Sequence, residues 1–277
     1  SVGDERFFAY VHYMDIHWPY NRRLPDETGR FGKTDYRPKP PEHWTAVDEW
    51  AEENLNEKSL AAIVASYDEE LAYVDRAFGE LMDWLEERGT LDDTIVVLLA
   101  DHGEGFNEHG KLQHGFEPYE AVTGIPLLIR LPPIYNIEPK ATDALIGLVD
   151  ISPTVFELVG LKPPKRAQGR SAVPAILGDG SRQRPVYVEG LGVRGLRGET
   201  HTVFVDSGGE RTCFDNLIDP AERSPLSAPL PTTCDQLATT GMALAERFEL
   251  LAGGDEDATV TMDEEEVEAL RALGYLD

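Results

Sequence analysis

The chain has 277 residues, 41% of them hydrophobic, which is enough to bury the core of one large domain with a smaller appendage. Its 51 acidic residues against 25 basic ones give a formal net charge of −26, which opposes binding to nucleic acids and anionic lipid surfaces. This charge indicates either adaptation to a salty medium or one large acidic patch. No apolar run approaches the roughly 20 residues of a membrane span, and no signal peptide is recognisable, so we expect a soluble protein whose compartment stays open.

The first predicted elements alternate between strand and helix. Phe7–Met14 is a nearly continuous apolar and aromatic run, which is typical of a central strand. Asn21–Asn54 contains several prolines and no sustained period, so it is expected to be a long surface loop. From Glu57 to Arg88 apolar residues recur at three- and four-residue steps, which predicts an amphipathic helix, and Gly89 is placed to cap it in a left-handed conformation.

The next run, Thr94–Ala100, is wholly apolar apart from its first residue and predicts a strand buried on both faces. Because a long helix connects it to the first strand, the two are expected to be parallel. A short helix at Pro118–Val122 and a strand at Ile125–Leu131 follow. Ser152, ahead of a proline, is the expected N-cap of a helix that ends at Gly160.

The pattern changes near residue 180. Val186–Val188 and Thr202–Val205 are short apolar runs separated by glycines, which indicates a small antiparallel sheet, and the acidic tail Asp263–Leu273 predicts a short helix. The expected fold class is therefore α/β. A partial mixed or parallel sheet flanked by helices is assigned to residues 1–180, and a smaller α+β subdomain to residues 181–277.

Five of the seven histidines fall in two short windows, each of which follows or overlaps a predicted strand: His12, His17, His102, His109 and His114. Within the first strand, His12 is interpreted as a core histidine. His109 is interpreted as an anchor of its loop. His17, in a rigid His-x-Pro-Tyr turn, and His114 are candidate functional residues.

Asp101 and His102 directly follow the second strand, and the turn at Gly103 allows both side chains to face one ion. A carboxylate with an imidazole suits a divalent metal, although both residues are also common in turns that bind nothing. Glu104 and Glu108 are expected either to orient the imidazoles or to be solvated.

Further segments accompany this cluster along almost the whole chain: His17–Tyr20, Asp101–Glu104, Glu108–Gly110, His114–Gly115, Tyr119–Glu120, Ile125–Ile129, Val149–Thr154, Gln168–Ser171, Phe214–Glu222 and Leu270–Tyr275. Together they resemble the sulfatase family of the alkaline-phosphatase superfamily. The resemblance implies that Asp101 and His102 are metal ligands and that His17 contacts the sulfate and the leaving oxygen. It implies calcium as the ion, whereas the imidazole ligand leaves manganese or zinc open.

His114 stands where many sulfatases place a lysine that holds the sulfate. A histidine at this position is expected to hold the sulfate as a cation, to act as a general acid, or to bind a second metal. The family also carries an Asp-Asp pair and a Cys/Ser-x-Pro/Ala-x-Arg nucleophile segment in its N-terminal half, for which we find no counterpart. Cys213 and Cys234 stand in other contexts and either pair or stay free.

The chain is thus interpreted as the C-terminal portion of a sulfatase-like enzyme, inactive alone and dependent on its N-terminal half or on a second copy of itself. The expected activity of the intact protein is metal-dependent hydrolysis of sulfate esters. Two alternatives remain. One is a phosphomonoesterase, phosphodiesterase or phosphotransferase of the same superfamily, and the other is a non-catalytic, acidic metal-binding fragment.

Overall fold

The computed structural model describes residues 6–20, 29–32, 39, 41, 46–116, 118–165, 167–178 and 184–252. The chain forms two compact units that are interleaved in sequence. The first comprises Ser1–Val96, Gly110–Gln113 and Arg130–Ile134, and the second comprises Val97–His109, His114–Ile129 and Tyr135–Asp277. The domain boundary expected near residue 180 stays a prediction. In the part of the chain that is described, no helix is long and apolar enough to cross a membrane.

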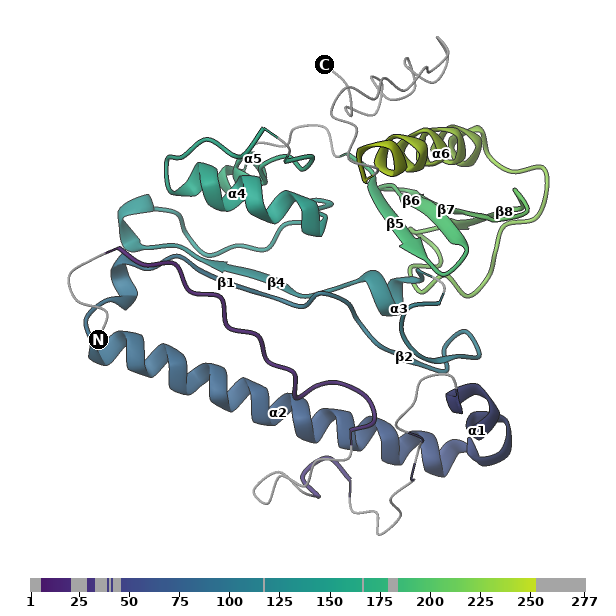
Figure 1. Ribbon diagram of the computed structural model, residues 1–277, viewed down its shortest axis with the longest axis horizontal. Coiled ribbons are helices and arrows are strands. Elements are labelled where there is room, and N and C mark those ends of the chain that lie inside the picture. The colour runs from purple at the N-terminus through teal and green to yellow at the C-terminus, as the bar shows by residue number, and fades with distance from the viewer. Residues whose placement is uncertain are drawn as a thin grey trace. The chain divides into compact units, whose positions relative to one another are not determined.

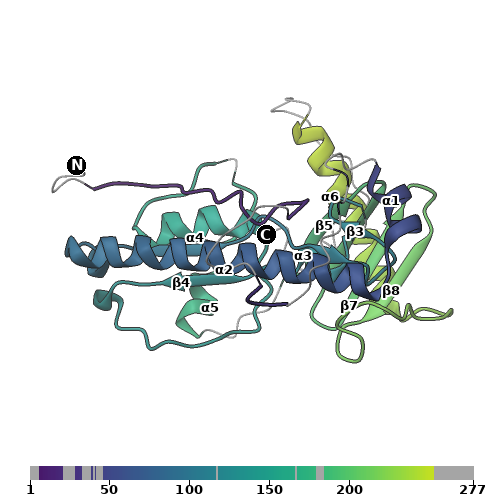
Figure 2. The same cartoon turned by 90° about the horizontal axis from the view of Figure 1, so that it is seen from below.

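The first unit is built on the predicted amphipathic helix, α2, which spans Glu57–Glu87 and is preceded by α1, Val47–Asn54 (Figures 1 and 2). Asn56 caps α2, because its side chain accepts hydrogen bonds from the N–H groups of Lys58 and Ser59. Gly89 has φ +68°, as expected of a left-handed cap. The periodic signal alone therefore located this helix, whereas α1, within the expected surface loop, was missed. A 3₁₀ turn, Leu91–Asp93, follows.

The predicted strand at Phe7–Met14 is wrong, because the structure has no strand over these residues. Phe8 is 84% exposed and His12 is exposed, so the interpretation of His12 as a core histidine is also wrong. The expected parallel pairing with the second strand is absent as well. A strand requires a partner for its N–H and C=O groups, and an apolar run does not specify one.

The two strands predicted at Thr94–Ala100 and Ile125–Leu131 are confirmed as β1, Val96–Leu99, and β4, Leu127–Arg130, which pair with each other. All four residues of β1 are only partly buried, so the expectation of burial on both faces is wrong. The short elements between them are β2, Gly105–Phe106, β3, Leu112–Gln113, and α3, Glu120–Thr123. Helix α3 confirms the short helix expected at this point.

After β4 come two 3₁₀ turns, Pro133–Tyr135 and Leu148–Asp150, and two helices, α4, Ile151–Leu158, and α5, Val173–Leu177. The predicted N-cap at Ser152 is wrong. The second 3₁₀ turn runs directly into α4, so that Ser152 lies inside its first turn.

The expected antiparallel sheet is confirmed in the second unit. It has four strands in sequence order: β5, Val186–Gly190, β6, Val193–Arg197, β7, His201–Asp206, and β8, Arg211–Asp215. Helix α6, Thr232–Ala252, covers one face of this sheet (Figure 1).

Alternate residues of the strands separate the two faces of the sheet. Leu196, Val203 and Val205 pack toward α6, and Phe204 and Phe214 belong to a second buried cluster. Cys213 of β8 and Cys234 of α6 form a disulfide, which resolves the two alternatives left open for them. The helix predicted at Asp263–Leu273 lies outside the described residues.

Candidate active site

Asp101 and His102 lie at the end of β1, with Asp101 Oδ1 3.7 Å from His102 Nε2. The Asp101 carboxylate is largely exposed. His102 Nδ1 lies 2.8 Å from the carbonyl oxygen of Gly103, so an Nδ1–H donated there leaves Nε2 with a free lone pair. A histidine whose second ring nitrogen is held by a backbone carbonyl is the usual arrangement of a metal ligand.

The backbone of the Asp101–Glu104 turn is fastened to α3. Gly103 N–H donates to the Val122 carbonyl at 2.6 Å, and Glu104 N–H donates to the Ala121 carbonyl at 3.1 Å. A Cβ atom on Gly103 would collide with the Ala121 carbonyl oxygen. Glycine is therefore required at this position so that the turn approaches α3 closely enough for both hydrogen bonds.

His114 lies against His102, with the two rings stacked at 3.7 Å. Its Nδ1 is 3.1 Å from Glu104 Oε1, and the Glu104 side chain is only 5% exposed. The structure thus brings three candidate residues together and adds Glu104 as the group that orients His114. Glu108 is exposed and accepts a hydrogen bond from the N–H of Phe106.

The backbone that follows His114 is held by the β5–β6 hairpin. Leu191 N–H donates to the Phe116 carbonyl at 2.7 Å and also to the Gly115 carbonyl. A Cβ atom on Gly190 would overlap the Phe116 carbonyl oxygen, so this contact too requires glycine. The small sheet therefore fixes the position of the segment that carries His114.

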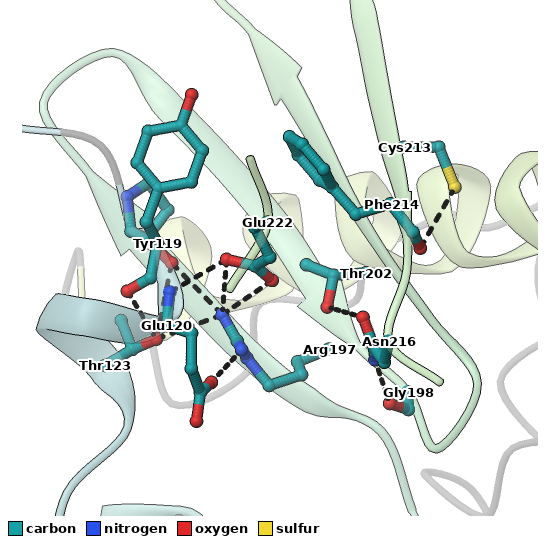
Figure 3. Close-up of polar contacts among 11 residues, drawn as sticks. Tyr119, Glu120, Thr123, Arg197, Gly198, Thr202, Cys213, Phe214, Asn216 and Glu222 are labelled. Carbon is teal, nitrogen blue, oxygen red and sulfur yellow. Dashed lines mark hydrogen bonds and ion pairs between the residues drawn. The ribbon is translucent and has the colours of Figure 1, made fainter. Parts of the chain in front are cut away.

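An ion-pair network centred on the largely buried residues Arg197 and Glu222 connects α3 to the same sheet (Figure 3). Arg197 of β6 pairs with Glu222 at 3.0 Å and with Glu120 of α3, and Glu222 also accepts the N–H of Glu120 at 2.8 Å. Arg197 further donates to the Thr123 hydroxyl at 3.2 Å. Because α3 accepts the hydrogen bonds of the Asp101–Glu104 turn, a network that holds α3 in place also helps to hold this turn.

His109 packs against an aromatic residue, Tyr119. Its ring stacks on Tyr119 at 3.6 Å with an interplanar angle of 6°, and Tyr119 in turn contacts Phe204 and Phe214 edge-on. This geometry agrees with the interpretation of His109 as a loop anchor.

His17 belongs to the first compact unit, whereas Asp101, His102 and His114 belong to the second. It is exposed, and its Nδ1 lies 3.0 Å from the Trp18 carbonyl. The neighbouring Trp18 is buried and donates its indole N–H to the Pro41 carbonyl at 2.8 Å. The turn is thus anchored by its tryptophan, and the role of His17 stays a prediction.

A divalent ion fits Asp101 and His102 as part of its ligand set. Ligand bonds of about 2.0–2.6 Å place neighbouring donor atoms roughly 3–4 Å apart, and the observed separation is 3.7 Å. Among the described residues, no group of three or more His, Cys, Asp or Glu side chains is arranged to hold an ion. The described part of the chain therefore offers two donors, and a complete site needs more.

A cavity of about 960 Å³ lies in the second unit, and its lining includes Asp101, His102 and His114. Asp150 holds one wall of the cavity together. Its buried carboxylate accepts hydrogen bonds from the N–H groups of Gly147 and Arg170 and pairs with Arg184 at 2.7 Å. Sequence reasoning identified the segment around Asp150 only as a family landmark. The cavity residues Lys165, Arg184, Tyr187 and Arg247 were not anticipated, because no local pattern marks them.

Tyr187 on β5 also lines the cavity and donates its hydroxyl proton to Glu189 at 3.3 Å. Burial, followed by the negative charge of Glu189, raises the pKa of Tyr187 from 10.0 to about 12. We expect ultraviolet titration of the parent to show one tyrosine that ionises only near pH 12. This high-pH transition is expected to be absent from Tyr187→Phe. Since the folded pKa lies above the unfolded one, the associated stability is present below pH 10 and falls as the pH rises toward 12. If the free energy of unfolding of the parent and of Tyr187→Phe depends on pH in the same way, the assignment of this raised pKa to Tyr187 is contradicted.

Comparison with known proteins gives one consistent family. A family model described as Sulfatase matches residues 1–161. The endo-4-O-sulfatase of Bacteroides thetaiotaomicron is 32% identical over 166 residues, which cover 57% of this chain and 32% of that protein. The chain spans about a third or less of the length of such curated relatives.

Solved structures show the same fold at low identity. A putative sulfatase from Bacteroides thetaiotaomicron has a TM-score of 0.62 and 21% identity, covering 83% of this chain and 56% of that one. The phosphonate monoester hydrolase of Agrobacterium radiobacter has a TM-score of 0.57 and 22% identity, covering 73% and 43%. The predicted α/β fold with a small C-terminal antiparallel sheet is confirmed.

Proposed function

Since the chain belongs to the sulfatase family of the alkaline-phosphatase superfamily, we propose that it supplies part of the active site of a metal-dependent sulfate ester hydrolase. The observation that carries the proposal is the grouping of Asp101, His102 and His114 at one cavity, with Glu104 holding His114. The nucleophile is assigned to a part of the intact protein outside these 277 residues.

Asp101 and His102 are the proposed metal ligands. A divalent ion held there would stabilise the negative charge that develops on the transferred sulfate group. Calcium is the ion expected from the family, and the imidazole ligand keeps manganese and zinc as alternatives. Isothermal titration of this chain with each metal, compared between the parent and Asp101→Ala, tests the assignment independently of activity.

His114 is proposed to act on the leaving group. Attack of a hydroxyl nucleophile on sulfur breaks the bond to the ester oxygen, which departs with the bonding electron pair and needs a proton. With Nδ1–H directed at Glu104, the protonated His114 ring has Nε2–H left to give. For His17, contact with the sulfate and the leaving oxygen is proposed from the family resemblance alone.

A phosphate or phosphonate ester is the second candidate substrate class. The structural likeness to a phosphonate monoester hydrolase supports it, because the two chemistries share a fold and a tetrahedral anionic group. Rates with matched 4-nitrophenyl sulfate, phosphate and phosphonate esters discriminate the classes. We expect the sulfate ester to have the highest kcat/KM.

We expect the intact protein to release sulfate in a chelator-sensitive reaction and these 277 residues alone to show no turnover.

In the intact protein, His114→Ala is expected to lower kcat by about 100-fold, the size typical of a lost general acid. The matched control is His201→Ala, since His201 lies on β7 and outside the cavity lining. Robust turnover by this chain alone, or equal activity of the two variants, would refute the assignment. Metal binding without any turnover by the intact protein would favour the non-catalytic alternative.

A further inference from the structure

Helix α3 is too short to hold itself in place. It has four residues, Glu120–Thr123, and its N-cap residue, Tyr119, makes no side-chain capping hydrogen bond. A single helical turn fixes several backbone dihedral angles in return for few hydrogen bonds, so it is unstable without contacts from outside. The position of α3 therefore depends on the groups that contact it from other parts of the chain.

Two charged side chains from distant segments make such contacts. Glu222 lies 102 residues further along the chain than Glu120 and accepts its backbone N–H at 2.8 Å. Arg197 of β6 contacts the same segment at three points, namely the Glu120 carboxylate, the Thr123 hydroxyl and the Pro118 carbonyl. In Figure 3, dashed contacts run from both side chains to α3. The Arg197–Glu222 pair thus holds α3 through both its backbone and its side chains.

The backbone of α3 in turn holds the Asp101–Glu104 turn. The Val122 carbonyl accepts the Gly103 N–H at 2.6 Å, and the Ala121 carbonyl accepts the Glu104 N–H at 3.1 Å. The contact at Gly103 is so close that a Cβ atom there would collide with α3. If α3 shifts, the turn must follow it or lose these hydrogen bonds. One short helix therefore connects Glu222 to the segment that carries the proposed metal ligands.

The ion pair is more costly than a contact that only joins two segments needs to be. Glu222 is fully buried and Arg197 is 13% exposed. Burial raises the pKa of Glu222 and lowers the pKa of Arg197, because each charged form loses water. An apolar pair of similar size would join the sheet to α3 without this cost. What the charged pair adds is direction, since a guanidinium fork and a carboxylate make hydrogen bonds of defined geometry.

We infer that Glu222 and Arg197 are positioning residues of the metal site, because they fix α3 and, through its carbonyl groups, the turn that carries Asp101 and His102. Neither residue lines the cavity. The inference rests on the proposed function and extends it to the residues that set the affinity for the metal. Replacing a group that orients a metal ligand typically lowers metal affinity by about 10- to 100-fold. Glu222 and Arg197 act from further away, so we expect the lower end, about tenfold.

The first test uses Arg197→Met/Glu222→Leu in the intact protein. Apolar groups of similar size replace both charges, so much of the stability is expected to remain, but the Glu120 N–H loses its acceptor. Hydrogen exchange, followed by mass spectrometry, is expected to be about tenfold faster at the Gly103 and Glu104 amides and little changed in β7. Unchanged exchange at these two amides, or equal acceleration in β7, would overturn the inference.

The second test is the affinity of the intact protein for Ca²⁺ and Mn²⁺, measured by isothermal titration at a temperature where every variant is folded. The double variant is expected to bind the ion about tenfold more weakly than the parent. Arg211→Met is the matched control, because Arg211 of β8 pairs with Asp235 at 2.8 Å, away from the cavity lining. It is expected to keep the affinity of the parent.

A milder variant covers the case in which the double variant does not fold. Thr123→Val removes the hydroxyl that accepts from Arg197 at 3.2 Å and leaves the Arg197–Glu222 pair intact. It is expected to weaken metal binding in the same direction, by about threefold, the size of one neutral hydrogen bond. Metal affinity equal to that of the parent in this variant would overturn the inference even if the double variant is unfolded.

The two readouts separate this inference from the proposed function. If the intact parent binds neither ion, the proposed metal assignment fails, and the exchange rates at Gly103 and Glu104 alone decide whether the pair positions the turn. If the parent and the folded double variant bind the ions equally well, the proposed function stands and the positioning role is overturned. A purely structural role predicts this second result, because metal affinity would then return together with stability.

Discussion

Arg197→Met is expected to destabilise the protein by about 3–5 kcal/mol, because it leaves the Glu222 carboxylate buried without its cation. Arg197 is 13% exposed and Glu222 is fully buried, and their atoms lie 3.0 Å apart. Burial raises the pKa of Glu222, and the Arg197 charge acts against that rise. Chemical denaturation followed by circular dichroism measures the loss.

The same strand contains the control. Arg194 of β6 also pairs with two carboxylates, those of Glu189 and Glu249, but these groups are exposed. Arg194→Met is therefore expected to cost no more than about 1 kcal/mol. If Arg197→Met and Arg194→Met lower the free energy of unfolding equally, burial of the Arg197 network does not contribute to stability.

A double variant distinguishes two causes of the expected destabilisation. One is the cost of leaving the buried Glu222 carboxylate without a cation, and the other is the loss of the attraction between Arg197 and Glu222. In Arg197→Met/Glu222→Leu both buried charges are replaced by apolar groups of similar size, so we expect much of the stability of the parent to return. Glu120 is 43% exposed and is solvated when its arginine is removed. If the double variant is as unstable as Arg197→Met alone, the network stabilises the fold through its attraction itself.

Loss of the Cys213–Cys234 disulfide is the second large effect that we expect. It closes a loop with a sequence separation of 21 residues between β8 and α6, for which the chain-entropy model gives about 3 kcal/mol. Both cysteines are completely buried in the core beneath α6. Reduction is therefore expected to move the denaturation midpoint of the parent well downward.

The reductant needs a control of its own. Cys213→Ala/Cys234→Ala is expected to be less stable than the parent and to show no further change when reductant is added. Counting of free thiols under denaturing, non-reducing conditions is expected to find none in the parent. Two reactive thiols, or a midpoint that is indifferent to reductant, would contradict the disulfide.

The elements that sequence reasoning located are those whose signal is local. Helix α2 carries its whole apolar stripe and its capping glycine within one segment, so its end was correctly expected just before Gly89. The strands β5 and β7 likewise show as short apolar runs. The same type of signal failed at Phe7–Met14, because whether an apolar run becomes a strand depends on a partner elsewhere in the chain.

The candidate site divides in the same way. Asp101, His102 and His114 fall within 14 consecutive residues, and their residue types and spacing marked them before the structure did. Arg197 and Glu222 are distant in sequence from α3, which they hold, and Lys165 and Arg247 come from separate segments. No pattern within a short window identifies such residues.

The sequence by itself determined the α/β class, the sulfatase resemblance and the cluster of groups that carry the proposed chemistry, because each is read from short segments whose patterns are local. Only the tertiary structure decided that Glu104 holds His114, that the small sheet and the Arg197–Glu222 pair fasten the loops around it, and that residues from distant segments line one cavity. These features are contacts between distant segments, and their energies depend on burial, which spacing in a sequence does not specify.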